Sequence, residues 1–239
     1  MLKGLQKKGH KKPLLTSYIS SYNPENDPEG RVKVPWLMNF DRFIPEGAVF
    51  FLPATIPGWE EMTEPIPGRF YSAHFAFSLG SFVKEVPHDP EYYFHGEEIS
   101  IAVRAFTHGY DLFHPHQVVI WHYYTRSNQP RHWTDSKDWV KLDSASHTKV
   151  RKLLGIDGEK LTKRGKNKYG LGTERSLKEY EKYAGVLFKK RQVQQYTLDC
   201  NYPPNPSYSN DSDYTKSFLS YFLCHLRNVN FLYYGKVQM

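Results

Sequence analysis

Cysteine is scarce in this chain, and long apolar runs are missing from it. The 239 residues include two cysteines, Cys200 and Cys224, which excludes a disulfide-stapled scaffold and a four-thiolate zinc site. No stretch approaches the roughly 20 consecutive apolar residues that a membrane-spanning helix needs. The lysine-rich first 12 residues are not followed by the apolar segment of a signal peptide. We therefore expect a cytoplasmic protein without a membrane span.

Aromatic side chains are abundant by comparison. They make up 16% of the residues, alongside 16 prolines and 16 glycines. Many rigid rings and many turns are common in folds that handle carbohydrates, although composition alone does not establish that function.

The positive charge is concentrated in one segment. Residues 151–190 hold twelve basic and five acidic side chains, an excess equal to the net charge of +7 of the whole chain. One interpretation is a patch for nucleic acid or another anion, and the other is a solvated helical face with a basic loop. The second is favoured because residues 176–183 mix both signs at helical spacing and no nucleic-acid motif accompanies them. We expect no nucleic-acid partner.

The segments before and after the centre of the chain give coarse predictions of secondary structure. Nine prolines between residues 13 and 68 predict long loops with short strands such as 48–52. Residues 70–79 predict a buried strand or strand-turn. Helices are predicted over about 144–154 and from about residue 174. The polar segment 201–213 predicts a linker, and 218–234 predicts a final apolar helix or strand.

The central segment gives the sharpest prediction. Apolar residues follow the helical i, i+3, i+4, i+7 spacing at Ile99, Ala102, Val103 and Phe106. Gly96 precedes this helix and Gly109 ends it. Residues 117–121 then predict a short buried strand that ends at His122. A side chain in that position lies at the carboxyl edge of a sheet, where open α/β folds bind ligands.

Charged and metal-ligating side chains gather in the same region. Glu97 and Glu98 occupy the first turn of the predicted helix, where carboxylates suit hydrogen bonds to sugar hydroxyls or a nearby cation, or cap the helix dipole only. His122 is a candidate ligand for manganese or zinc, and a histidine bonded to neighbouring backbone is an equal alternative. Asp89, before a proline, favours a turn residue over a site residue.

The crowding of histidines also suggests metal binding. Nine of the eleven histidines fall between residues 74 and 147. The hydrolytic zinc motif, two histidines four apart on a helix with a glutamate between them, is absent. His114 and His116 would share a face of an extended strand, but two loop histidines beside a turn proline are the favoured interpretation.

Several motifs in chain order closely resemble the GlcNAc-transferase family, whose members include the cytoplasmic polypeptide hydroxyproline α-N-acetylglucosaminyltransferases. The resemblance spans roughly residues 11–192. The motifs are FYSAHFAF at 70–77, VPHDP at 86–90, FHGEEI at 94–99, RAFTHGYD at 104–111, WHYYTR at 121–126, RHW at 131–133 and YGLGTERS at 169–176.

The resemblance implies a GT-A type glycosyltransferase. Such an enzyme uses UDP-GlcNAc as donor and a divalent cation, Mn²⁺ or Mg²⁺, and transfers the sugar with retention to a hydroxyl of a protein or glycan, with protein hydroxyproline as one acceptor. It also implies the roles of individual residues: catalytic Glu97 and Glu98, donor-binding Gly96, Trp121 and Arg126, and the metal ligand His122.

The sequence departs from the family at its beginning. Family members start with a Rossmann-like half that binds the nucleotide and carries an Asp-x-His or Asp-x-Asp metal motif, whereas residues 12–18 resemble the strand that follows that motif. Asp211-Ser212-Asp213 is the only Asp-x-Asp, and we interpret it as linker. The expected fold is therefore α/β, the C-terminal portion of a GT-A (Rossmann-like) fold with long loops.

Two domains and two functions follow from this departure as expectations. Residues 1–195 form the glycosyltransferase domain without its nucleotide-binding half, and residues 196–239 form a tail of linker and short apolar element. The chain is expected to transfer GlcNAc only when the missing half is supplied. The alternative is a non-catalytic remnant that binds carbohydrate or protein.

Overall fold

The computed structural model describes residues 1–125, 130, 132–160, 167–205 and 214–216. Its helices are α1 (Leu2–Lys7), α2 (Phe82–Glu85), α3 (Glu97–Thr107), α4 (His132–Asp135), α5 (Trp139–Leu154), α6 (Leu177–Ala184) and α7 (Gln195–Leu198), with short 3-10 helices at Pro24–Asn26, Trp59–Glu61 and Ile156–Gly158. Its strands are β1 (Pro13–Thr16), β2 (Ser20–Ser21), β3 (Trp36–Phe43), β4 (Val49–Thr55), β5 (Ile66–Pro67), β6 (Ala76–Phe77), β7 (Asp111–His114), β8 (Trp121–His122), β9 (Val186–Leu187), β10 (Gln192–Gln194) and β11 (Tyr214–Lys216). The predicted α/β class is confirmed.

A four-stranded mixed sheet lies beside the central helix. Its strand order is β5-β7-β1-β6, with β1 parallel to β7 and antiparallel to β6. Leu14 of β1 pairs with Leu112 of β7, and both side chains are buried. Residues 13–16 thus form a strand, as the resemblance implied for segment 12–18, and the structure places it inside the sheet.

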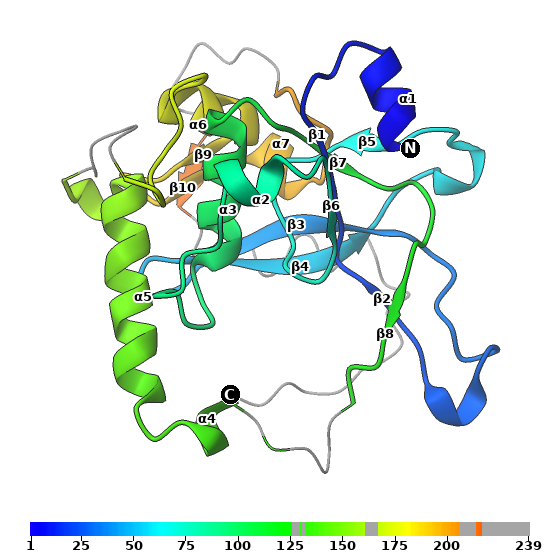
Figure 1. Ribbon diagram of the computed structural model, residues 1–239, viewed down its shortest axis with the longest axis horizontal. Helices are drawn as coiled ribbons and strands as arrows, with labels where there is room; N and C mark the ends of the chain where they lie inside the picture. Colours follow the sequence, from blue (N-terminus) through cyan, green and yellow to red (C-terminus); the bar gives the residue numbers. More distant parts are fainter. Residues whose placement is uncertain (126–129, 131, 161–166, 206–213, 217–239) are drawn as a thin grey trace.

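Helix α3 lies between α5 and the strands of this sheet, and it also contacts α6 (Figure 1). Ile99, Ala102 and Val103 are each 0% exposed, so the apolar stripe of the sequence faces the core. Gly96 precedes the helix with φ 88°, and Gly109 follows it with φ 87°. Both glycines therefore adopt the left-handed conformation that favours glycine, and the predicted helix is confirmed at both ends.

The proline-rich segment contains a β-hairpin, where long loops and short strands were expected. β3 and β4 pair in antiparallel register from Trp36 opposite Thr55 to Phe43 opposite Val49, with an irregularity after Phe40. The expected strand at 48–52 lies within β4, but β3 was expected to be loop. Prolines do not exclude strands here: Pro35 directly precedes β3, and Pro53 lies within β4 opposite Met38. The hairpin is a two-stranded sheet, so both strands are edge strands, where proline is tolerated.

The predicted buried strand at 117–121 is wrong. Its apolar residues Val119 and Ile120 are 42% and 46% exposed, and only Trp121 and His122 form a strand, β8, which is parallel to β2. The buried strand is β7, directly after the Gly109 turn. Local hydrophobicity cannot decide between two neighbouring apolar runs, since burial depends on which run reaches an inner strand of the sheet.

Helices α5 and α6 begin at other residues than expected. α5 begins at Trp139, before the predicted start near residue 144. α6 begins after Ser176, whose hydroxyl accepts a hydrogen bond from the Glu179 backbone N–H while the Glu179 carboxylate accepts one from the Ser176 N–H, a capping box. None of the described helices has both the length and the apolar character needed to cross a bilayer.

Part of the predicted tail packs onto the domain. Leu198 in α7 belongs to the main core, and Cys200 and Tyr202 pack against a smaller core that includes Leu37 of β3 and Ala54 of β4. The buried Arg69 donates hydrogen bonds to the Asn201 carbonyl and the Asn205 side chain. Asp211-Ser212-Asp213 and the apolar element predicted at 218–234 lie outside the described residues, and the domain boundary at 195 stays a prediction.

Candidate active site

The start of α3 holds Glu98 in a defined orientation. Glu98 Oε1 accepts a hydrogen bond of 2.9 Å from the backbone N–H of Ala73. Burial raises the pKa of the Glu98 carboxyl to about 7; this hydrogen bond opposes the shift, and the charge of Glu97 adds to it. A carboxyl with this pKa exchanges its proton near neutral pH, so it can donate as well as accept a hydrogen bond.

Glu97 is the second carboxylate of this turn. Its Oε2 lies 3.5 Å from Nδ1 of His88, whose side chain is largely exposed. Burial raises the pKa of Glu97, and His88 opposes that shift. The two glutamates therefore lie in different environments, one facing Ala73 and the other facing His88.

Four rings pack together, those of Tyr18, His74, His122 and Tyr124, and Glu98 lies close enough to the two tyrosines for its charge to act on them. The four rings and Glu98 are called the Glu98 cluster below. The ring of His74 lies 4.4 Å from that of Tyr18, and the ring of His122 lies 4.4 Å from that of Tyr124, centroid to centroid. His74 and His122 are 5.9 Å apart.

The Glu98 carboxylate affects the pKa of both tyrosines in the Glu98 cluster. Burial is the main cause that raises the pKa of Tyr18 and of Tyr124, and the negative charge of Glu98 adds to both shifts. The Tyr124 hydroxyl donates a hydrogen bond of 2.7 Å to the Ile19 carbonyl. Both phenols therefore stay neutral near pH 7, and their hydroxyls can hydrogen-bond to a polar ligand without adding a negative charge to the site.

The structure brings some of the predicted site residues together and places others elsewhere. Glu98 and His122 come together in the Glu98 cluster, with Glu97 adjacent in the chain. Gly96 has a packing role, because a Cβ there would lie 3.2 Å from the Val150 Cβ.

Trp121 and Arg126 complete the set of predicted donor contacts. The Trp121 Nε1–H donates a hydrogen bond of 2.9 Å to the Val32 carbonyl, and the guanidinium of Arg31 lies 4.9 Å from a Trp121 ring centroid. Neighbouring side chains of a strand point to opposite faces, so Trp121 packs against the 31–32 segment while His122 joins the cluster. Arg126 lies outside the described residues.

Sequence reasoning missed three partners of Glu98. Tyr18, the Ala73 N–H and His74 come from segments 24 or more residues away in the chain. His74 and Ala73 fall inside the 70–77 motif that carries the family resemblance, but no spacing in the sequence connects that motif to the glutamates. The motif itself was the available signal.

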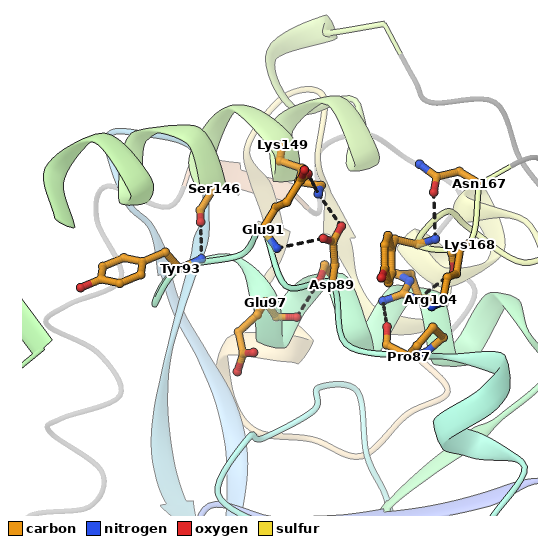
Figure 2. A network of polar contacts seen from close by, with 12 residues as sticks. Pro87, Asp89, Glu91, Tyr93, Glu97, Arg104, Ser146, Lys149, Asn167 and Lys168 are labelled. Atoms are coloured by element: carbon orange, nitrogen blue, oxygen red, sulfur yellow. Dashed lines mark hydrogen bonds and ion pairs between the residues drawn. The ribbon is translucent and has the colours of Figure 1, made fainter. Parts of the chain in front are cut away.

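A buried polar network holds the segment that leads into α3 (Figure 2). Arg104 is 1% exposed and donates hydrogen bonds to the Pro87 carbonyl at 2.9 Å and the Lys168 carbonyl at 3.4 Å. Asp89 pairs with Lys149 of α5 at 2.5 Å.

The orientation of this segment follows from the same network. Asp89 Oδ1 accepts a hydrogen bond from the Glu91 N–H, so the turn predicted for Asp89 is confirmed. Figure 2 shows the Glu97 carboxylate pointing away from these contacts. The network therefore positions the backbone and leaves the carboxylate available for another partner.

The described side chains near His122 are too few to complete the coordination of a cation. Within the part of the chain that the structure describes, no group of three histidine, cysteine or acidic side chains contains His122. His74 supplies a second imidazole nearby. A cation bound through His122 would therefore take most of its ligands from elsewhere, as Mg²⁺ does when substrate phosphates complete its coordination.

The raised pKa of Glu98 predicts a dependence of stability on pH. Because the folded-state pKa of about 7 lies above the ordinary 4.5, Glu98 favours folding fully below pH 4.5, and this contribution is lost as the pH rises through 7. We expect the free energy of unfolding to fall over this range by up to about 3 kcal/mol through Glu98.

Urea unfolding of the wild type and of Glu98→Gln across that range measures this effect. The glutamine variant lacks the titrating group, so its stability relative to the wild type should rise with pH. The same pH dependence in both proteins would contradict the assignment.

The geometry defines an α/β domain with paired carboxylates at the start of a buried helix, beside imidazole and phenol rings, a site suited to a hydroxyl-rich ligand. The family model of glycosyltransferases named GlcNAc matches residues 1–190. The chain belongs to this GlcNAc glycosyltransferase family, and the resemblance in its motifs is confirmed. No curated protein and no solved structure matches the chain.

Proposed function

We propose that this chain, when a nucleotide-binding half is supplied, transfers N-acetylglucosamine from UDP-GlcNAc to a hydroxyl of a protein or glycan, hydroxyproline among the acceptors, with retention at the anomeric carbon. The observation that carries the proposal is the Glu98 carboxyl, which accepts a hydrogen bond of 2.9 Å from the Ala73 N–H and whose charge acts on Tyr18 and Tyr124 of the Glu98 cluster. Membership of a glycosyltransferase family supports a sugar donor and an acceptor as ligands.

Glu98 is proposed to orient the donor sugar. With a pKa of about 7, its carboxyl donates a hydrogen bond to the sugar when protonated and accepts one from a hydroxyl when ionised. Glu97 lies beside His88 and is partly exposed to solvent. It is proposed to contact the sugar or the acceptor. Tyr18 and Tyr124 provide flat faces and neutral hydroxyls at the same site.

His122 is proposed to bind the cation together with oxygens of the donor diphosphate. A bound Mn²⁺ or Mg²⁺ supplies charge stabilisation for the departing nucleotide. The diphosphate contact proposed for Arg126 belongs to the same part of the site. A cytoplasmic location is part of this proposal.

A metal-independent binding function is the second candidate. It is favoured by the incomplete ligand set of His122 within the described residues. Saturable binding of a glycan that is unchanged by a chelator, without turnover of UDP-GlcNAc, would support it over the transferase.

Replacing His122 with alanine tests the cation assignment. We expect the Mn²⁺ concentration for half-maximal transfer to rise by at least about 10- to 100-fold, because the loss of a residue that only supports a metal ligand already lowers metal affinity by this much. Transfer of radiolabelled GlcNAc from UDP-GlcNAc to a hydroxyproline peptide, with release of UDP, gives this value when it is measured over a Mn²⁺ titration. His10→Gln, which alters a histidine paired with Asp111, is the matched control. An unchanged Mn²⁺ dependence in His122→Ala would reject His122 as a ligand.

A further inference from the structure

Three metal-ligating side chains meet outside the Glu98 cluster. Asp143 and His147 lie one helical turn apart on α5, and His95 lies in the segment that leads into α3. One ligand atom from each of the three lies within 4.8 Å of the others. His95 and His147 are stacked, with ring centroids 5.6 Å apart and an interplanar angle of 24°.

The distances between these atoms suit a shared ion better than direct hydrogen bonds. His95 Nδ1 lies 3.4 Å from Asp143 Oδ1, and His147 Nε2 lies 3.8 Å from Asp143 Oδ2. Hydrogen bonds between such groups are usually shorter, about 2.7–3.2 Å. Two ligands at roughly 2.1 Å from an ion in tetrahedral or octahedral geometry are about 3.0–3.4 Å apart. Small side-chain movements would therefore bring all three ligand atoms to bonding distance of one ion.

His147 provides a second, independent observation. Its side chain is 5% exposed, and its Nε2 is buried without a hydrogen-bond partner in the described part of the chain. This nitrogen faces Asp143 from within the cluster. An imidazole nitrogen buried without a partner costs free energy, and coordination of an ion would satisfy it.

The backbone around the three ligands is already held in place. The Tyr93 N–H donates a hydrogen bond to the Ser146 hydroxyl, which ties the segment before His95 to the turn of α5 before His147. Gly96 packs against Val150 one turn further along α5. A site whose two chain segments are fixed by other contacts loses less entropy when an ion binds.

We propose that His95, Asp143 and His147 bind a divalent transition-metal ion, for which Zn²⁺ is the best match. Two imidazoles and one carboxylate are a common ligand set for zinc, with water in the remaining position, whereas Mg²⁺ and Ca²⁺ prefer oxygen ligands throughout. The ion would join α5 to the segment that begins α3, two residues before Glu97. This site is separate from the donor cation proposed at His122.

Zinc binding by the full chain, stripped of metal with a chelator, tests the proposal. Isothermal titration with Zn²⁺ should show one tight site in the wild type, weakened by at least about 10- to 100-fold in His95→Gln and in Asp143→Asn. Both substitutions keep the size of the side chain, and His95 is partly exposed, so these variants are expected to fold. Circular dichroism of the metal-free variants checks this.

Two controls separate this site from weaker ones. His10→Gln removes a histidine that lies 2.8 Å from Asp111 and belongs to no group of three metal-ligating side chains in the described part of the chain, and it should keep the wild-type affinity. His122→Ala should also keep it, so a failure of the proposed function at His122 leaves this result unaffected. Co²⁺ in place of Zn²⁺ should give visible absorption bands that the His95→Gln variant lacks.

Three outcomes would overturn the proposal. The first is a wild type that binds Zn²⁺ no more tightly than His95→Gln and Asp143→Asn do. The second is a loss of affinity in His10→Gln or His122→Ala equal to that in Asp143→Asn. The third is a Co²⁺ spectrum that does not change when His95 is replaced.

Discussion

Replacing Glu98 with glutamine is expected to lower kcat/KM for GlcNAc transfer by about 10²- to 10³-fold, the range reported for removal of one charge-stabilising group from an active site. The glutamine keeps the size of the side chain, and its amide oxygen can still accept the hydrogen bond from the Ala73 N–H. It has no ionisable proton, so the exchange between donor and acceptor near neutral pH is lost. Initial rates with radiolabelled UDP-GlcNAc and a hydroxyproline peptide measure the effect.

Glu91→Gln is the matched control for this prediction. Glu91 lies in the segment that leads into the same helix and pairs with Lys149, but its side chain is 78% exposed. We expect its activity to stay within about twofold of the wild type, since exposed ion pairs contribute little. Glu98→Gln is expected to be at least as stable as the wild type above pH 7. A measurement of its stability there therefore shows whether lost activity is caused by unfolding. Full activity in Glu98→Gln would reject the role of Glu98.

Replacing Arg104 with alanine is expected to have the largest effect on stability, a loss of about 3–5 kcal/mol. The Arg104 side chain is 1% exposed and donates to the Pro87 and Lys168 carbonyls. Its removal leaves a cavity and two carbonyls without this donor. The segment between Pro87 and Glu97 then loses one of its anchors.

Urea unfolding at neutral pH measures this loss, with Lys168→Ala as control. The Lys168 side chain is exposed while its backbone carbonyl accepts the hydrogen bond, so this variant keeps the contact and should lose less than about 0.5 kcal/mol. Equal stabilities of the two variants would contradict the role of the Arg104 network.

Helix α3 shows what local sequence can predict. Its apolar spacing, two acidic residues in the first turn and a glycine at each end are all short-range features, and the structure has the helix at Glu97–Thr107 between Gly96 and Gly109. The energies behind them arise within a few residues of the chain. The same features placed Glu97 and Glu98 together at the start of the helix.

Strand β7 shows where local sequence is insufficient. Residues 111–114 and 117–121 both carry apolar side chains, but only the first reaches β1, about 100 residues earlier in the chain. The prediction chose the second run, and that error also placed His122 at the end of a buried strand. The pairing that decides between them is a long-range contact, and no periodicity in either segment encodes it.

The amino-acid sequence by itself determined the α/β class, the central helix, its paired glutamates and the motifs of a glycosyltransferase family. Only the tertiary structure decided which side chains face those glutamates, that Trp121 packs away from His122, and that His95 meets Asp143 and His147 across 48 residues or more. The physical reason is the range of the interactions. Helix spacing and capping act between neighbours, whereas the Glu98 cluster and the proposed zinc ligands form when distant segments pack on one core.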